Sequence, residues 1–315
     1  MSNISRKDFT FLSSDAVHNI NCFAFYPDNP KAILQIEHGV AEHIERYVSF
    51  AEKMAEQGFA VFADDHLGHG KSFTNQDEMC WFAENDGWHL ICEDVVKLRK
   101  IATDMFPEIP FILMGHSMGS FIARTVAIDH SDLIDALVLS GTGHQSGLII
   151  GLGKTVARFE KGRLGTSKGR SNIIENLAFG AYNKKFAPNR TTHDWLSRDD
   201  KEVDKYIADP LSGSNVSVGL FYDMLSGLDY IRRPKNISKI RKDLPIYIFS
   251  GDKDPVGDMG KGVKTVYNLY LSSEIKDVSL KLYPEGRHEL LNGPDREKVT
   301  VELTKWLNNK IRSRK

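Results

Sequence analysis

The fold of this chain is decided by the stretch Phe111-Ile112-Leu113-Met114-Gly115-His116-Ser117-Met118-Gly119. Its four leading apolar residues predict a short buried strand, and the helical pattern of residues 118–129 begins directly after the serine. Gly-x-Ser-x-Gly in that context is typical of a sharp turn from strand to helix that exposes the serine hydroxyl. Glycine is expected on both sides because a side chain there would collide with the neighbouring strand or helix. We therefore predict that Ser117 is a nucleophile.

A second copy of the pattern shows that the pattern alone is weak. Gly165-Thr166-Ser167-Lys168-Gly169 also fits it, but no predicted strand precedes this copy. Because the strand-to-helix context is what the mechanism requires, we expect no catalytic role for Ser167.

Short apolar runs alternate with amphipathic stretches on both sides of Ser117. This alternation predicts an α/β fold, with a mostly parallel sheet flanked by helices. The expected strands are residues 9–12, 20–26, 32–36, 60–63, 111–114, 136–139, 246–250 and 278–283. The expected helices of this part are residues 45–57, 88–106, 118–129, 261–271 and 297–311.

The alternation stops after residue 143 and resumes at residue 242. Between these points helical patterns and polar loops follow one another without a convincing strand. We therefore predict a first core part over 1–143, an inserted, mainly helical cap over 144–241, and a second core part over 242–315, so that the sheet closes across the insertion.

The composition argues against nucleic acid as a partner. The chain has 315 residues, with 41 Lys and Arg against 42 Asp and Glu and a net charge of −1, so no global field would attract a polyanion. Residues 1–15 lack the basic start and apolar run of a secretory signal, and no stretch is apolar for long enough to span a membrane. We expect a cytoplasmic protein.

A serine nucleophile needs a histidine that takes its proton and a carboxylate that orients the histidine. In this type of fold the order along the chain is Ser, acid, His. His288 is the later histidine that directly follows a predicted strand, so we predict that it is the base. Asp252 and Asp254 both lie in the loop after residues 246–250, and their spacing leaves the choice of acid open.

Acyl transfer also needs donors for the developing oxyanion. One is expected to be the backbone N–H of Met118, directly after the nucleophile. The second is expected from His38-Gly39-Val40, after the predicted strand 32–36, where the N–H of Val40 is the candidate.

With these motifs the chain resembles α/β-hydrolases of the monoacylglycerol lipase and lysophospholipase type, grouped with the serine aminopeptidase S33 domain. The resemblance extends over nearly the whole length. It rests on 37–43 (EHGVAEH) with Arg46-Tyr47, on 65–72 (DHLGHGKS), on the Ser117 turn, on 251–257 (GDKDPVG) and on 286–289 (GRHE).

The resemblance implies an eight-stranded α/β-hydrolase sheet, hydrolysis of carboxylic esters, and no cofactor or metal. It implies that Asp254, the last residue of Gly-x-x-Asp, is the acid, and that Val40 and Met118 supply the oxyanion donors. It also points to monoacylglycerols or lysophospholipids as substrates. Some apolar residues of the cap are expected to line an acyl pocket, and most to form the core of the cap: Leu148, Ile149, Ile150, Phe179, Leu220, Phe221, Met224 and Leu225.

Three other functions stay open as alternatives. An aminopeptidase would need an acidic cap residue that binds the substrate amine, for which Glu175, Asp194 and Asp223 are candidates. An acyltransferase or thioesterase would differ in the group that resolves the acyl-enzyme. A non-catalytic binding protein usually lacks part of the triad, whereas the predicted triad is complete.

Two further groups of residues have competing interpretations. Asp64, Asp65, His66 and His69 could be imagined as a metal cluster, but the resemblance implies that they shape a loop. Residues 154–170 hold six basic side chains against one acidic, Glu160. This segment is expected to be a solvated face, with transient contact to anionic lipid as the alternative.

Overall fold

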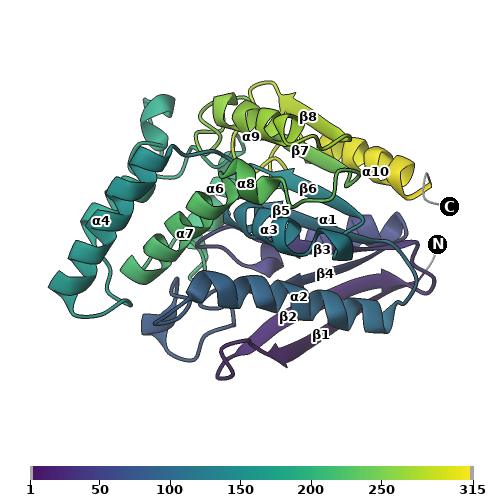
Figure 1. Ribbon diagram of the computed structural model, residues 1–315, viewed down its shortest axis with the longest axis horizontal. Coiled ribbons are helices and arrows are strands. Elements are labelled where there is room, and N and C mark those ends of the chain that lie inside the picture. Colours follow the sequence, from purple (N-terminus) through teal and green to yellow (C-terminus); the bar gives the residue numbers. More distant parts are fainter. Residues whose placement is uncertain (1–2, 313–315) are drawn as a thin grey trace.

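A single eight-stranded sheet runs through the computed structural model, which describes residues 3–312 (Figure 1). The strands lie in the order β1-β2-β4-β3-β5-β6-β7-β8. β1, β2 and β4 pair antiparallel, and all other neighbours pair parallel, as expected for an α/β hydrolase. Their bounds are β1 (Ile4–Leu12), β2 (Asn19–Pro27), β3 (Ala32–Glu37), β4 (Phe59–Asp64), β5 (Phe111–His116), β6 (Ala136–Ser140), β7 (Ile246–Gly251) and β8 (Val278–Tyr283).

Helices cover both faces of the sheet, which is why the central strands are apolar on both sides. One face packs against α2 (Gly87–Met105), α3 (Met118–Asp129) and α9 (Lys261–Ser272). The opposite face packs against α1 (Val48–Glu56) and α10 (Arg296–Arg312). Along β3, Ile33 belongs to the first core, whereas Leu34 and Ile36 belong to the second.

The predicted helix over 45–57 differs from the structure at its start. A 3₁₀ turn, η1 (Ile44–Tyr47), precedes α1, and the N–H of Ile44 donates to Asp65 Oδ1 at 2.9 Å. This bond ties the start of the segment to the loop after β4, a long-range contact that the helical pattern does not encode.

The chain between β6 and β7 forms α4 (Gly147–Leu164), α5 (Asn172–Ala178), α6 (Asp200–Ala208), α7 (Val218–Ile231) and α8 (Pro234–Ile237). Figure 1 shows α4 and α7 side by side at one end of the sheet. α7 also packs on the sheet helices: a Cβ at Gly227 would lie 2.1 Å from Trp88 of α2. The division into 1–143, 144–241 and 242–315 stays a prediction.

The parallel strands bring the predicted site residues to one edge of the sheet, because their carboxyl ends meet there. The loops after β3, β5, β7 and β8 carry Val40, Ser117, Asp254 and His288 respectively. Within residues 3–312, no helix combines the length and apolar character needed to cross a bilayer.

Candidate active site

Ser117 lies on a strained turn between β5 and α3. Its φ and ψ are 52° and −119°, a backbone conformation that L-residues rarely adopt. A Cβ at Gly115 would lie 2.2 Å from the carbonyl oxygen of Gly119, and a Cβ at Gly119 would lie 2.1 Å from that of Glu37. Both glycines of the motif are therefore required by backbone contacts, as the sequence predicts.

His288 and Asp254 form a buried pair beside this turn. Nδ1 of His288 donates to Asp254 Oδ2 at 2.9 Å, and the side chains are 3% and 0% exposed. The Asp254 carboxylate also accepts from Ser250 Oγ at 3.1 Å and from the Val256 N–H at 2.9 Å. Asp252 instead accepts the N–H of Glu285 at 2.8 Å, which closes the neighbouring turn. Of the two aspartates that the sequence left open, Asp254 is the one that contacts the histidine.

The two histidines of the site, His288 and His116, have pKa values shifted in opposite directions by their surroundings. Burial lowers the pKa of His288, but the Asp254 charge and hydrogen bond outweigh this effect and raise its pKa above the usual 6.5. The ring of His116 lies beside it, tilted by 44°, with ring centroids 4.6 Å apart. Burial and the neighbouring His288 lower the pKa of His116 to about 4. His288 is therefore the ring suited to carrying a proton near neutral pH.

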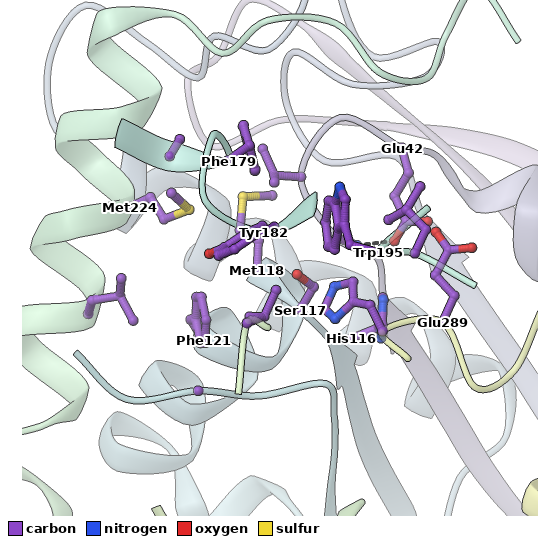
Figure 2. A pocket seen from close by; sticks show the side chains of 18 of the residues that line it. Glu42, His116, Ser117, Met118, Phe121, Phe179, Tyr182, Trp195, Met224 and Glu289 are labelled. Carbon is purple, nitrogen blue, oxygen red and sulfur yellow. Dashed lines mark hydrogen bonds between the residues drawn. The ribbon is translucent and has the colours of Figure 1, made fainter. Parts of the chain in front are cut away.

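Ser117 and His288 line the same cavity, together with Val40 and Met118. Figure 2 shows Ser117 and Met118 in this cavity. Within residues 3–312 no hydrogen bond joins the Ser117 hydroxyl to His288. Such bonds are often long or poorly aligned in enzymes without substrate and tighten in the complex. The structure thus brings four of the five predicted residues to one cavity, with Asp254 behind His288.

Two backbone amides are available at the same place. Met118 opens α3, so its N–H belongs to the first turn, where amides have no partner within the helix. The N–H of Val40 has no acceptor in the described part of the chain. Gly39 brings the Val40 loop against the serine, since a Cβ at Gly39 would lie 3.1 Å from Ser117 Cβ.

Comparison with known proteins identifies the family. A family model described as "Serine aminopeptidase, S33" matches residues 28–295. The chain belongs to this family. A monoglyceride lipase homolog of Monkeypox virus is 29% identical to this S33-family hydrolase over 286 residues, 90% of this chain and 91% of the relative. A monoacylglycerol lipase of Mycolicibacterium smegmatis is 28% identical over 287 residues, 89% of this chain and 90% of the relative.

A solved structure shows the same relationship in three dimensions. The crystal structure of a thermostable carboxyl esterase from Bacillus coagulans, in complex with glycerol, superposes with a TM-score of 0.90. It is 30% identical and covers 98% of this chain and 99% of its own. The S33-family hydrolase is thus a carboxylic ester hydrolase with the α/β-hydrolase fold, as the resemblance in its sequence implies.

The chain between β6 and β7 supplies cavity residues that the sequence does not predict. Trp195 packs on His288 with ring centroids 5.1 Å apart, and Tyr182 packs on Trp195 at 5.0 Å. Figure 2 shows both rings beside Ser117. These residues lie in a polar stretch between α5 and α6, where no periodicity indicates burial. The sequence therefore gives no indication that they line the cavity.

The second Gly-x-Ser-x-Gly copy lies elsewhere. Ser167 is buried, donates to Glu84 at 2.5 Å and accepts from Trp81 Nε1 at 2.8 Å. It does not line the cavity with Ser117. Its hydroxyl therefore serves a structural contact between the segment after α4 and the segment before α2.

The acidic and histidine residues at the carboxyl ends of β3 and β4 and in the loop after β4 divide into two groups. Asp65 accepts the N–H groups of Ile44 and Lys71, and His69 contacts the carbonyl of Leu67, so these two hold the loop. Glu37, Asp64 and His66 are buried, with candidate ligand atoms within 4.8 Å of one another. They are the described residues closest to a metal-binding arrangement, and they do not line the cavity.

Proposed function

We propose that the hydrolase cleaves esters in two steps through a covalent acyl-enzyme. His288 accepts the Ser117 proton through Nε2 as the serine oxygen attacks the carbonyl carbon, while Asp254 holds Nδ1 and stabilises the imidazolium. The tetrahedral intermediate then collapses, and the alcohol leaves with the proton from His288. The observation that carries this proposal is the 2.9 Å contact of the buried Asp254 and His288 beside the strained serine.

The oxyanion of each tetrahedral intermediate would be stabilised by the amides of Val40 and Met118. One such donor contributes roughly 2.7–4 kcal/mol to the transition state. In the second step His288 takes a proton from water, which attacks the acyl-enzyme and releases the carboxylic acid and Ser117. Neither step draws on a metal or cofactor.

We infer that the acyl group comes from a lipid, such as a monoacylglycerol or lysophospholipid. The cavity walls beyond Ser117 are largely apolar: Phe121, Phe179, Met224, Leu228 and Val256. Of the cap residues named from the sequence, Phe179 and Met224 line this cavity, whereas Ile150, Leu220, Phe221 and Leu225 are buried. The monoglyceride lipases among the relatives support the same substrate class.

The placement of acidic residues favours ester over amine-bearing peptide substrates. Glu175, Asp194 and Asp223, the candidates for binding an amine, do not line the cavity with Ser117. Asp194 accepts from Thr191 and Arg190, which occupy its carboxylate. The two carboxylates that do line the cavity, Glu42 and Glu289, are both paired with Arg46. Among residues 3–312, an incoming ammonium group would find no unpaired carboxylate in this cavity.

We also infer that α4 contacts an anionic lipid surface. Leu148, Leu152 and Phe159 are 75%, 61% and 69% exposed. Their spacing of four and seven residues places them on one face of the helix. The exposed Arg158 flanks this apolar stripe, as expected of a helix that lies on a membrane surface. A cytoplasmic location stays a prediction from the sequence.

The proposal is tested with an activity-based probe and a substrate panel. A fluorophosphonate should label wild-type protein and the Ser167→Ala variant equally, and should fail to label Ser117→Ala. Turnover of monoglycerides, lysolipids and p-nitrophenyl esters should disappear with the label, while aminoacyl anilides should remain uncleaved by all three proteins. Labelling that survives in Ser117→Ala would overturn the assignment, and anilide cleavage by the wild type would favour a peptidase.

A further inference from the structure

Arg46 forms a buried link between two carboxylates that line the cavity. Its Nη1 donates to Glu42 Oε2 and Glu289 Oε1, each at 2.6 Å, and its Nη2 donates to Glu289 Oε2 at 2.6 Å. The three side chains are at most 10% exposed. Figure 2 shows the carboxylates of Glu42 and Glu289 next to one another on one side of the cavity. The guanidinium charge of Arg46 offsets the repulsion between these two buried carboxylates.

The first carboxylate acts on the Val40 loop. Glu42 Oε1 accepts the N–H of Gly39 at 2.5 Å and the hydroxyl of Tyr47 at 2.8 Å. Burial alone would raise the pKa of Glu42, but the charge of Arg46, followed by His116 and these hydrogen bonds, holds it at about 2. Glu42 therefore stays ionised and holds the backbone directly before the Val40 amide.

The second carboxylate belongs to the loop of the base, because Glu289 directly follows His288. The N–H of Glu289 donates to the carbonyl of Leu196 at 2.8 Å, which ties the same loop to the cap. The bidentate contact with Arg46 fixes the Glu289 side chain in one plane, a geometry that a lysine cannot reproduce. Arg46 thus joins the loop after β3 to the loop after β8, 243 residues apart in the chain.

We propose that Arg46 is a positioning residue that holds the Val40 loop and the His288 loop at a fixed mutual distance during ester hydrolysis. It touches neither the substrate nor the reacting atoms in this arrangement, and it acts through Glu42 and Glu289. This inference rests on the proposed roles of Val40 and His288. It goes beyond them by assigning a residue outside the triad to the alignment of its parts.

Arg46 also compensates charge around the base. Several titratable groups face His288 or its ionised partners: Asp254, Glu289, Glu42 of the β3 loop, His116 of β5, and Tyr182, His193 and Tyr206 of the chain between β6 and β7. Glu42 and Glu289 both favour the imidazolium form of His288. Loss of the Arg46 charge would leave their field uncompensated, so the His288 pKa would rise; loss of the Glu289 charge would have the opposite effect.

The first test compares turnover of a soluble p-nitrophenyl ester by Arg46→Met, Arg46→Lys and wild type. Arg46→Met should lower kcat by roughly 10²-fold with a smaller change in KM, because small misplacements of reacting groups have effects of this size. Arg46→Lys keeps the positive charge but loses the bidentate contact with Glu289, so its kcat should lie between those of Arg46→Met and the wild type. The matched control is Arg163→Met, which removes an arginine from the buried Glu160 in α4, away from the cavity. It should leave kcat unchanged.

The second test is the pH dependence of kcat/KM. A purely structural role would not move the midpoint of its acid limb. Arg46→Met should shift it upward by about 0.5–1 pH unit, and Glu289→Gln should shift it downward. Arg46→Lys should leave it in place. Wild-type kcat together with an unmoved limb in a folded Arg46→Met variant would overturn the proposal.

If Arg46→Met does not fold, the Arg46→Lys and Glu289→Gln variants decide. Wild-type kcat in both would reject the positioning role, and reduced kcat with the stated pH dependence would support it.

Two outcomes keep this result separate from that of the proposed function. If Ser117→Ala retains turnover, the triad itself is wrong. Normal turnover in the Arg46 variants with an inactive Ser117→Ala would reject the positioning role alone.

Discussion

Nδ1 of His288 lies 2.9 Å from Asp254 Oδ2, whereas the carboxylate of Asp252, two residues earlier in the same loop, is bonded to the N–H of Glu285. The two aspartates therefore have different chemical surroundings despite their adjacency. Asp254 is shielded from water and orients a ring nitrogen, while Asp252 closes a turn near the surface.

This difference predicts unequal effects of the same substitution. Asp254→Asn should lower kcat by about 10⁴-fold, because an amide no longer selects the productive tautomer of the histidine. Asp252→Asn retains an oxygen that can accept from Glu285 and should leave kcat near the wild-type value. Steady-state rates on a soluble ester check both variants, and the reverse order would assign the acid to Asp252.

The raised pKa of His288 predicts the pH dependence of the reaction. A general base must be neutral in the free enzyme, so kcat/KM should rise with pH as His288 loses its proton. The midpoint of this acid limb should lie above 6.5, since the Asp254 charge and hydrogen bond outweigh the effect of burial. The measurement is kcat/KM against pH on a substrate without ionisable groups; a midpoint below 6.5 would contradict the ion pair.

The glycines of the chain allow a direct test of the turn that carries Ser117. Gly119→Ala would place a Cβ 2.1 Å from the carbonyl oxygen of Glu37, so it should reduce the free energy of unfolding by about 1–3 kcal/mol and impair turnover. Gly151→Ala in α4 meets nothing within 4 Å and should instead stabilise the protein by about 0.5–1 kcal/mol. Denaturant unfolding of both variants measures the difference. Equal stability of the two would show that β3 and α3 are not packed as described.

The exposed stripe of α4 predicts binding to lipid vesicles. Replacing Leu152 and Phe159 together by glutamate should weaken cosedimentation with vesicles that contain anionic phospholipid, because it removes apolar area and adds negative charge. Hydrolysis of a short soluble ester should be unaffected, since neither residue lines the cavity. Val301→Glu on α10, where Val301 is 66% exposed, is the matched control. Vesicle binding that survives the double substitution would reject α4 as the contact surface.

The local motifs were predictable because they obey short-range rules. The Gly-x-Ser-x-Gly turn needs two glycines within five residues, and the strand before it is apolar on both faces, so both features can be read from neighbouring positions. The position of His288 after a late strand follows from the same alternation of strands and helices. The resemblance to a known family then added the choice of Asp254, which spacing had left open.

Other features could not be predicted because they depend on residues far apart in the chain. The contact of Trp195 with His288 and the bidentate pairing of Arg46 with Glu289 join segments that have no common periodicity. Exposure is equally a property of the folded molecule: Leu148 faces outward while Ile150, two residues later, is buried.

The order of residues thus determined the fold and the chemical groups at its edge, because both follow from local backbone rules. The tertiary structure decided which of these groups meet and which apolar surfaces stay open, because such contacts arise only when the sheet brings the ends of its strands together.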